Sequence, residues 1–139
     1  MSENQNGGGI SQHQDFRKII RIDFEDEILF GQEQMYNTYP VTFPTVTFSL
    51  EPVDELVSMA KSVTGKESTY YFSVGICDLP DRKVESVISC YDSEDNMWVI
   101  DLSEEEQGEV WNALNSQCKE HLSKDCSQLL EEARGQMRA

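Results

Sequence analysis

Period-two alternation of apolar and polar residues marks the strands of this chain. It is clearest at 69–77, where four apolar side chains fall on one face without a polar interruption: Tyr70, Phe72, Val74 and Ile76. Alternation that is rich in β-branched and aromatic residues is typical of strands with one buried face. The same pattern predicts further strands at 16–24, 28–30, 39–50, 84–91 and 97–102.

Polar segments and prolines limit these strands. The polar segment 31–38 is expected to be a loop, and 92–96 is expected to join two strands as the loop of a hairpin. Pro40 and Pro44 cannot donate a hydrogen bond to a sheet ladder. We therefore expect the first half of 39–50 to lie at a sheet edge or a bulge.

Two segments carry the three- and four-residue spacing of an amphipathic helix. The first is expected to begin at Pro52 and to end at Gly65. The second begins at Ser103, which forms a capping box with Glu106. Its unbroken spacing favours one long helix over two helices with a break near Ser123. The apolar stripe consists of Val110, Trp111, Leu114, Cys118, Leu122, Cys126, Leu129, Leu130, Ala133 and Met137.

The order of these elements favours the α+β class. We expect a mostly antiparallel sheet of about five strands. The short middle helix and the long C-terminal helix would both pack on the face formed by the apolar residues of 69–77. The chain is expected to form a single α+β domain at 15–139. Residues 1–14 are expected to be a flexible N-terminal tail, because their Gly, Asn, Gln and Ser residues bury too little to offset the entropy of ordering.

The N-terminus and the cysteines indicate a cytoplasmic protein. The N-terminus lacks the basic start and apolar stretch of a secretory signal. No run approaches the roughly 20 apolar residues of a membrane helix. The cysteines are therefore expected to be reduced thiols, and an oxidising compartment would allow three alternative pairings among them. They are Cys77, Cys90, Cys118 and Cys126.

Acidic residues dominate the composition. The chain has 26 Asp and Glu against 11 Lys and Arg, which gives a formal net charge of −15. Eleven of the acids and two of the bases lie between Asp78 and Glu109. Such charge repels nucleic acid and anionic membranes and attracts basic surfaces. We therefore expect a protein partner with a basic surface, and no direct contact with nucleic acid or membrane.

The sequence carries no motif for catalysis or for a cofactor. It has no phosphate-binding glycine loop, dinucleotide fingerprint, nucleophile elbow or zinc-protease helix. Cys118, His121 and Cys126 lack the paired spacing of a structural zinc site, so the two cysteines are expected to be small core residues. The loop at 92–96 departs from the calcium-loop pattern, because Met97 stands where that pattern requires glycine. We expect no catalytic residue, cofactor or metal ion.

The most compact basic cluster contains Arg17, Lys18 and Arg21. In so acidic a chain, these side chains are expected to form local ion pairs rather than a nucleic-acid site. The carboxylates expected to pair with them are Asp23, Glu25 and Asp26.

The acidic stretch is the strongest functional candidate, as the contact surface of a non-enzymatic binding or inhibitor protein. Its contacts would be electrostatic, with neighbouring tyrosines as anchors. Nucleic-acid-handling proteins present suitable basic surfaces. DNA-mimicking inhibitors of phages and mobile elements, and immunity proteins against nuclease toxins, share this size and composition, although no motif of such a family is present. The expected contact residues are Glu85, Asp92, Glu94, Asp95, Asp101, Glu104, Glu105 and Glu109.

Two other functions stay open. A structural or chaperone-like accessory subunit could form a homodimer through its C-terminal helix, if the apolar stripe exceeds what the sheet can cover. A small enzyme or ligand-binding domain with a pocket beneath the sheet is the other, because a fold alone does not fix a function.

Overall fold

The structure is a computed structural model that describes residues 15–36, 39–78 and 84–138. The tail expected at 1–14 lies outside the described residues. The elements confirm the α+β class expected from the sequence. Their order is α1 (Phe16–Ile19), β1 (Leu29–Tyr36), β2 (Tyr39–Leu50), α2 (Asp54–Thr64), β3 (Tyr71–Cys77), β4 (Glu85–Tyr91), β5 (Met97–Ile100), α3 (Glu104–Leu122) and α4 (Cys126–Arg138).

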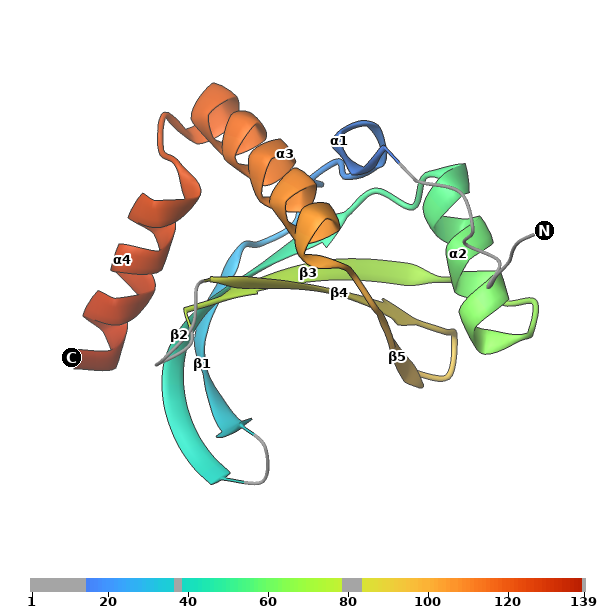
Figure 1. Cartoon of the computed structure of the whole chain (residues 1–139), viewed down its shortest axis with the longest axis horizontal. Coiled ribbons are helices and arrows are strands. Elements are labelled where there is room, and N and C mark those ends of the chain that lie inside the picture. The colour runs from blue at the N-terminus through green and yellow to red at the C-terminus, as the bar shows by residue number, and fades with distance from the viewer. Residues whose placement is uncertain (1–14, 37–38, 79–83, 139) are drawn as a thin grey trace.

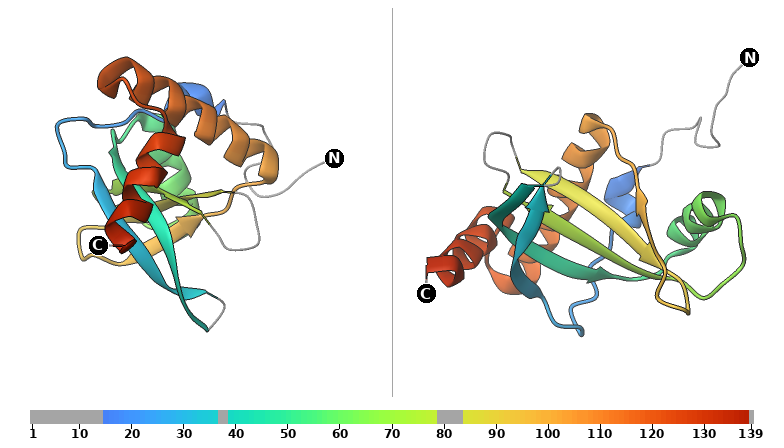
Figure 2. Two further views of the ribbon diagram at one scale, coloured as in Figure 1. Left: turned by 90° about the vertical axis from the view of Figure 1, so that its left-hand side faces the viewer. Right: turned by 90° about the horizontal axis from the view of Figure 1, so that it is seen from below.

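The described strands form one antiparallel sheet with the order β1-β2-β3-β4-β5. The sheet is bent, and α2, α3 and α4 lie on its convex side (Figure 1). Seen from below, no helix of the described residues crosses in front of β3, β4 and β5 (Figure 2). All helical packing is therefore on one side of the sheet, as the sequence predicted.

The core lies between the sheet and these helices. The four apolar side chains that alternate along 69–77 are all buried, and so are their neighbours Phe48 on β2 and Ile88 on β4. Leu56 of α2 and Leu114 of α3 pack on them from the helical side. None of the helices in the described part of the chain is long and apolar enough to cross a membrane.

β2 has the limits that alternation predicted, 39–50. Its first half pairs with β1, and pairing with β3 begins at Thr45, opposite Cys77. A register irregularity of β1 lies opposite this proline-containing half, in agreement with the expected edge or bulge. The loop predicted at 31–38 is wrong for 31–36, which continue β1, while 37–38 are outside the described residues. Ladder hydrogen bonds join backbone groups, so polar side chains do not prevent pairing at an edge strand.

The strand predicted at 16–24 is wrong. The segment begins with the short helix α1, and only an isolated bridge between Ile22 and Leu50 is strand-like. Ile19 and Ile20 are both buried. Neighbouring side chains of a strand point to opposite faces, so a strand with one buried face could not bury both isoleucines. The helical turn brings both side chains into the core.

α2 and α3 follow their sequence signals closely. Gly65 has a left-handed φ of 74° and ends α2. α2 begins at Asp54, so Pro52 precedes the helix instead of opening it. The capping box of α3 is present: the Ser103 N–H donates to Glu106 Oε1 at 2.8 Å, and the Glu106 N–H donates to Ser103 Oγ at 3.2 Å.

The C-terminal apolar stripe forms two helices, so the favoured single helix is wrong. α3 is long, but it ends at Leu122, and Ser123 has a left-handed φ of 59°. α4 then packs along β1 and β2, with Leu129 and Leu130 buried. The spacing continues across the break because both helices face the same core. Periodicity of this kind reports which residues are buried and not whether the helix is continuous.

Replacing Ser123 by glycine should raise the free energy of unfolding by about 0.5 to 1 kcal/mol, because glycine adopts a positive φ without Cβ strain. Urea denaturation followed by far-UV circular dichroism measures the change. The same substitution at Ser116, an exposed interior position of α3, is the control and should lower that free energy by a similar amount. Equal losses for the two variants would contradict the left-handed turn.

Candidate functional site

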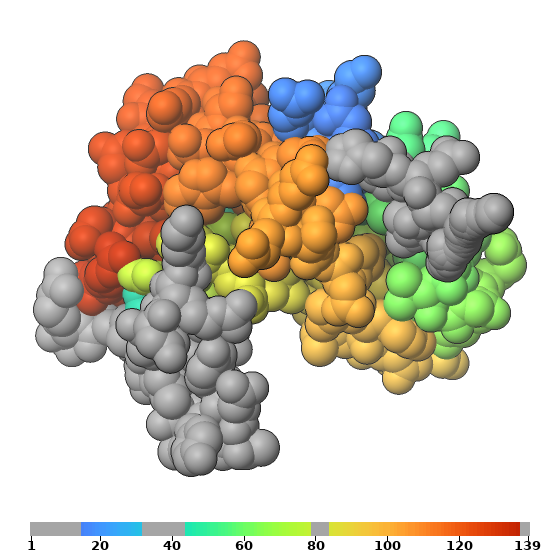
Figure 3. Space-filling view, viewed as in Figure 1, coloured from blue at the N-terminus to red at the C-terminus, as the bar shows by residue number. Residues whose placement is uncertain are grey.

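The acidic stretch follows the β4–β5 hairpin into α3. Eight carboxylates and no lysine or arginine lie between Asp92 and Glu109. In the space-filling view, the pale-orange surface of the hairpin continues into the orange surface of α3 on the same side of the molecule (Figure 3). We name the exposed carboxylates of the hairpin loop, the β5–α3 connection and the α3 start the acidic ridge. They are Glu94, Asp95, Asp101, Glu104 and Glu105.

The fold favours negative charge at one end of the ridge. Glu104 and Glu105 lie in the first turn of α3, directly after the N-cap residue. The free N–H groups of a helix N-terminus carry partial positive charge and stabilise carboxylates placed there. These two side chains therefore contribute to the stability of α3 and also present charge to solvent.

The bases of the described residues form their ion pairs with carboxylates outside the acidic ridge, although Glu94 also helps to raise the pKa of Lys66. No ion pair joins a ridge carboxylate to a lysine or arginine of the described residues. Most of the described bases pair with other carboxylates. These pairs are Arg17–Asp15, Arg21–Glu51, Lys61–Glu67, Lys66–Asp92, Lys124–Glu132, and Arg134 with Asp78 and Glu131. The field of the ridge is therefore directed into solvent.

Asp92 does not belong to the ridge, because its side chain is buried beneath the hairpin loop. Only 1% of the residue is exposed. Its Oδ1 accepts the N–H groups of Glu94 and Asn96, each at 2.9 Å. Its Oδ2 accepts the Asn96 side-chain amide at 3.1 Å and lies 2.6 Å from Lys66 Nζ. Asp92 thus organises the loop from inside, and we do not keep it among the expected contact residues.

The ion pair with Lys66 holds the pKa of Asp92 well below its usual range. The hydrogen bonds from Asn96 and from the loop backbone act in the same direction, and burial opposes them. The hydrogen bond with Asp92 in turn raises the pKa of Lys66. Both groups are therefore charged at neutral pH.

The hairpin loop is fixed to the connection between α2 and β3. Lys66 and Ser68 both come from that connection, and the Ser93 N–H donates to Ser68 Oγ at 3.3 Å. Lys66 Nζ also lies 5.3 Å from the centroid of the Trp98 ring, within reach of a cation–π interaction. The two ridge carboxylates of the loop are consequently held in place by groups from another part of the chain.

The two remaining expected contact residues are only partly exposed. Glu85 lies on β4, paired with Cys77 of β3. Glu109 Oε1 accepts the N–H of Phe16 at 3.2 Å and so ties α1 to α3. Both continue the acidic stretch, but neither is as accessible as the five residues of the ridge.

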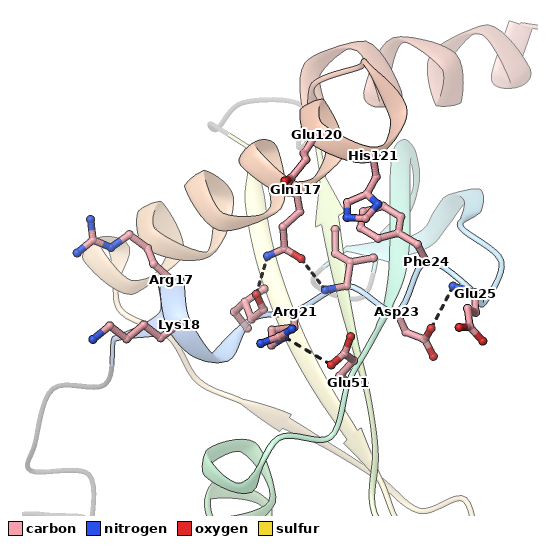
Figure 4. Close-up of a pocket in the computed structure, with 12 residues that line it drawn as sticks. Arg17, Lys18, Arg21, Asp23, Phe24, Glu25, Glu51, Gln117, Glu120 and His121 are labelled. Carbon is pink, nitrogen blue, oxygen red and sulfur yellow. Dashed lines mark hydrogen bonds and ion pairs between the residues drawn. The ribbon is translucent and has the colours of Figure 1, made fainter.

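A pocket of about 700 Å³ lies between the α1–β1 segment and α3 (Figure 4). Gln117 of α3 lines the pocket and is bonded to the backbone of the opposite segment. Its Oε1 accepts the Ile22 N–H at 2.8 Å, and its Nε2 donates to the Ile20 carbonyl at 2.7 Å. The ring of His121 stacks on Phe24 with centroids 4.3 Å apart. These groups hold the α1–β1 segment against α3, which is a structural role.

The basic cluster lines the same pocket. Arg21 pairs with Glu51 at 3.5 Å, and Arg17 pairs with Asp15 at the same distance. The sequence predicted local ion pairs for these arginines, but the predicted partners, the carboxylates of 23–26, were wrong. The partners are Asp15 and Glu51, because α1 and the bridge to β2 turn the two arginines toward them. The pocket contains both signs of charge and favours no ligand class.

Cys90, Cys118 and Cys126 are buried free thiols. Cys118 and Cys126 face each other across the α3–α4 turn. The hydrogen bond between their thiols lowers the pKa of Cys118 and raises that of Cys126. Within the part of the chain that the structure describes, no three His, Cys, Asp or Glu residues are placed to hold a metal ion.

All five residues of the ridge were among those singled out from the sequence, but the groups that hold the loop were not. Nothing in the sequence connects Lys66 or Ser68 with 92–96, because only the pairing of β3 with β4 brings these segments together. An Asp followed four residues later by Asn, between two strands, is a signal for a side chain that closes the loop. It was present at Asp92 and Asn96.

Comparison with models of protein families, with curated proteins and with solved structures gave no match to this chain. No role can therefore be carried over from a relative. The function has to be argued from the charges and surfaces of the chain itself.

Asp92→Asn should lower the stability of the fold at neutral pH, because it removes the ion pair with Lys66. A depressed pKa stabilises the fold fully above the unfolded-state pKa of Asp, 3.8, and this contribution is lost as the pH falls below that value. The difference between wild type and variant should therefore shrink between about pH 7 and about pH 2.5. Urea denaturation at both pH values measures it.

Asp95→Asn is the matched control, since Asp95 is exposed in the same loop and its positive φ of 64° suits asparagine. It should change stability little at either pH. A loss for Asp92→Asn that stays constant across the pH range would show that the charge of Asp92 does not stabilise the fold.

Proposed function

We propose that this protein is a non-enzymatic acidic binding protein that occupies a basic surface of a partner protein. The observation that carries the proposal is the acidic ridge, five exposed carboxylates without a neutralising base among the described residues. Complementary charge of this kind speeds encounter and discourages partners of the wrong sign. The loop at one end of the ridge is held by Asp92, so its charges keep a fixed spacing.

A nucleic-acid-handling protein is the partner class that such a ridge fits best. The groove of such a protein is lined by lysines and arginines that neutralise phosphates spaced closely along the nucleic acid. A row of carboxylates that enters the groove would compete for the same bases. The protein would then act as an inhibitor or an escort of its partner, in the manner of a DNA mimic or an immunity protein.

The structure favours this function over an accessory subunit that dimerises through the C-terminal stripe. Leu114, Cys118, Leu129 and Leu130 of that stripe are buried within the chain itself, against the sheet and between α3 and α4. The pocket beside α1 likewise gives little support to an enzyme, because Arg21 is paired with Glu51 and the Gln117 amide is bonded to the backbone of Ile20 and Ile22. The acidic ridge also extends beyond the carboxylates that stabilise α3, because Glu94, Asp95 and Asp101 precede that helix.

Affinity capture from an extract of the native host tests the proposal. The wild-type chain should retain a basic protein at low salt and release it at moderate salt, because exposed ion pairs are screened. Glu104→Gln combined with Glu105→Gln should weaken retention of that protein roughly two- to tenfold. Quantitative mass spectrometry of the eluates measures both effects.

The control bait is Asp54→Asn combined with Glu55→Gln. This variant also removes two exposed negative charges, but from the first turn of α2. It therefore matches the ridge variant in net charge and in the loss of helix-terminus stabilisation. This bait should behave like wild type. If both variants lose the partner equally, or if the retained protein is acidic, the ridge is not the contact surface.

A further inference from the structure

No helix of the described residues covers the concave side of the sheet (Figure 2). Ten side chains and Gly75 lie on this side in three cross-strand rows, which we name the open face. The first row is Tyr71, Tyr91 and Met97; the second is Ser49, Ser73, Ser89 and Val99; the third is Leu29, Thr47, Gly75 and Val87. Strand alternation places all of them opposite the core residues of the same strands.

The three rows of the open face carry no charge, and the next row along the strands, Gly31, Thr45, Cys77 and Glu85, adds a single carboxylate, that of Glu85. In the chain as a whole 27% of residues are charged, yet none of these eleven is. A solvated face of an antiparallel sheet is normally polar. Here Tyr71 is 60% exposed, Met97 56% and Val99 45%, and all three lie at the hairpin end of the sheet. Exposed apolar side chains that gather in this way mark an interaction surface.

Carboxylates surround this uncharged area. Glu94 and Asp95 lie in the loop that joins the first row, and Asp101 directly follows β5. At the β2 end of the second row, Asp26 Oδ2 accepts the Ser49 hydroxyl at 2.7 Å. Exposed apolar side chains bordered by charged ones are usual in a protein interface. Their complement has an apolar stripe with basic residues beside it.

The centre of the open face has small side chains. Ser73, Gly75 and Ser89 lie on the two middle strands, β3 and β4, between larger residues of the outer strands and the first row. The sheet bends inward on this side (Figure 1). An α-helix, about 10 Å across, presents an apolar stripe flanked by polar residues and suits a curved sheet face whose middle strands carry small side chains.

We propose that the open face docks a basic amphipathic helix of a partner protein. The apolar stripe of that helix lies on the three rows, and its lysines or arginines face the ridge carboxylates at the hairpin end. The inference rests on the proposed function and names the chemistry of the segment that the partner contributes. A second copy of this chain is a poor occupant, because two molecules of net charge −15 would bring their carboxylate rims together.

Synthetic peptides of about 18 residues, roughly five helical turns, serve as probes. The first consists of leucine and lysine with helical spacing. The second has the same composition with period-two spacing, and the third replaces every leucine of the first by serine. Fluorescence anisotropy with the full chain should give the tightest binding for the first peptide, by at least about tenfold over the serine peptide.

Tyr71→Thr combined with Val99→Thr should weaken binding of the first peptide by about tenfold or more, because it removes apolar contact and keeps residues that suit a strand. Val63→Thr is the matched control. Val63 is a 40% exposed apolar residue of α2, away from the open face, and its variant should bind like wild type. Circular dichroism and the thermal midpoint verify that each variant is folded.

The outcomes separate this inference from the proposed function. If the leucine and serine peptides bind equally, and the ridge variant weakens both, the ridge binds basic chains and the docking site is overturned. Tighter binding of the period-two peptide would overturn the helix as the occupant. A wild-type dimer in size-exclusion chromatography that the open-face variant dissociates would assign the face to a second copy and overturn the proposal. Loss of the host partner with the open-face variant but not with the ridge variant would instead overturn the proposed function.

Discussion

One-sided burial of the sheet is the constraint on which the rest of this structure depends. Alternate side chains of β2, β3 and β4 can be removed from water only if helices cover them, and α2, α3 and α4 all serve that purpose. Val46, Val74 and Ile88 are fully buried as a result. Most apolar residues of the helices are buried on this side. What remains outside is a charged outer surface of helices and loops and one sheet face with few charges.

The distribution of bases decides what this outer surface can do. Net charge far from zero disfavours the compact state through self-repulsion, and pairing of bases such as Lys124 and Arg134 with nearby acids limits that repulsion in α4. At the start of α3, the helix N-terminus has the same effect without any base. The ridge therefore keeps its charge at little expense to the fold. That charge lies beside the open face, so both surfaces can meet one partner.

Burial was predictable from the sequence where pattern and local geometry agree. The β3 alternation, the β4–β5 hairpin and the capping box at Ser103 were all foreseen. Periodicity could not show that α1 is a helix, because Ile19 and Ile20 are adjacent and either face could hold one of them. It could not show the turn at Ser123, because the same core continues across it. The burial of Asp92 depends on Lys66, a tertiary contact that no local pattern contains.

In the β4–β5 hairpin, the residues that hold the loop in shape differ from the residues that face solvent. Asp92 and Asn96 fix the shape of the loop, so binding need not order it and loses little conformational entropy there. Association would then be governed by diffusion and long-range attraction and not by a folding step. The outward side chains Ser93, Glu94 and Asp95 are also free to vary while the anchor stays. A lineage could retarget this protein to a changed partner at the loop tip without rebuilding its core.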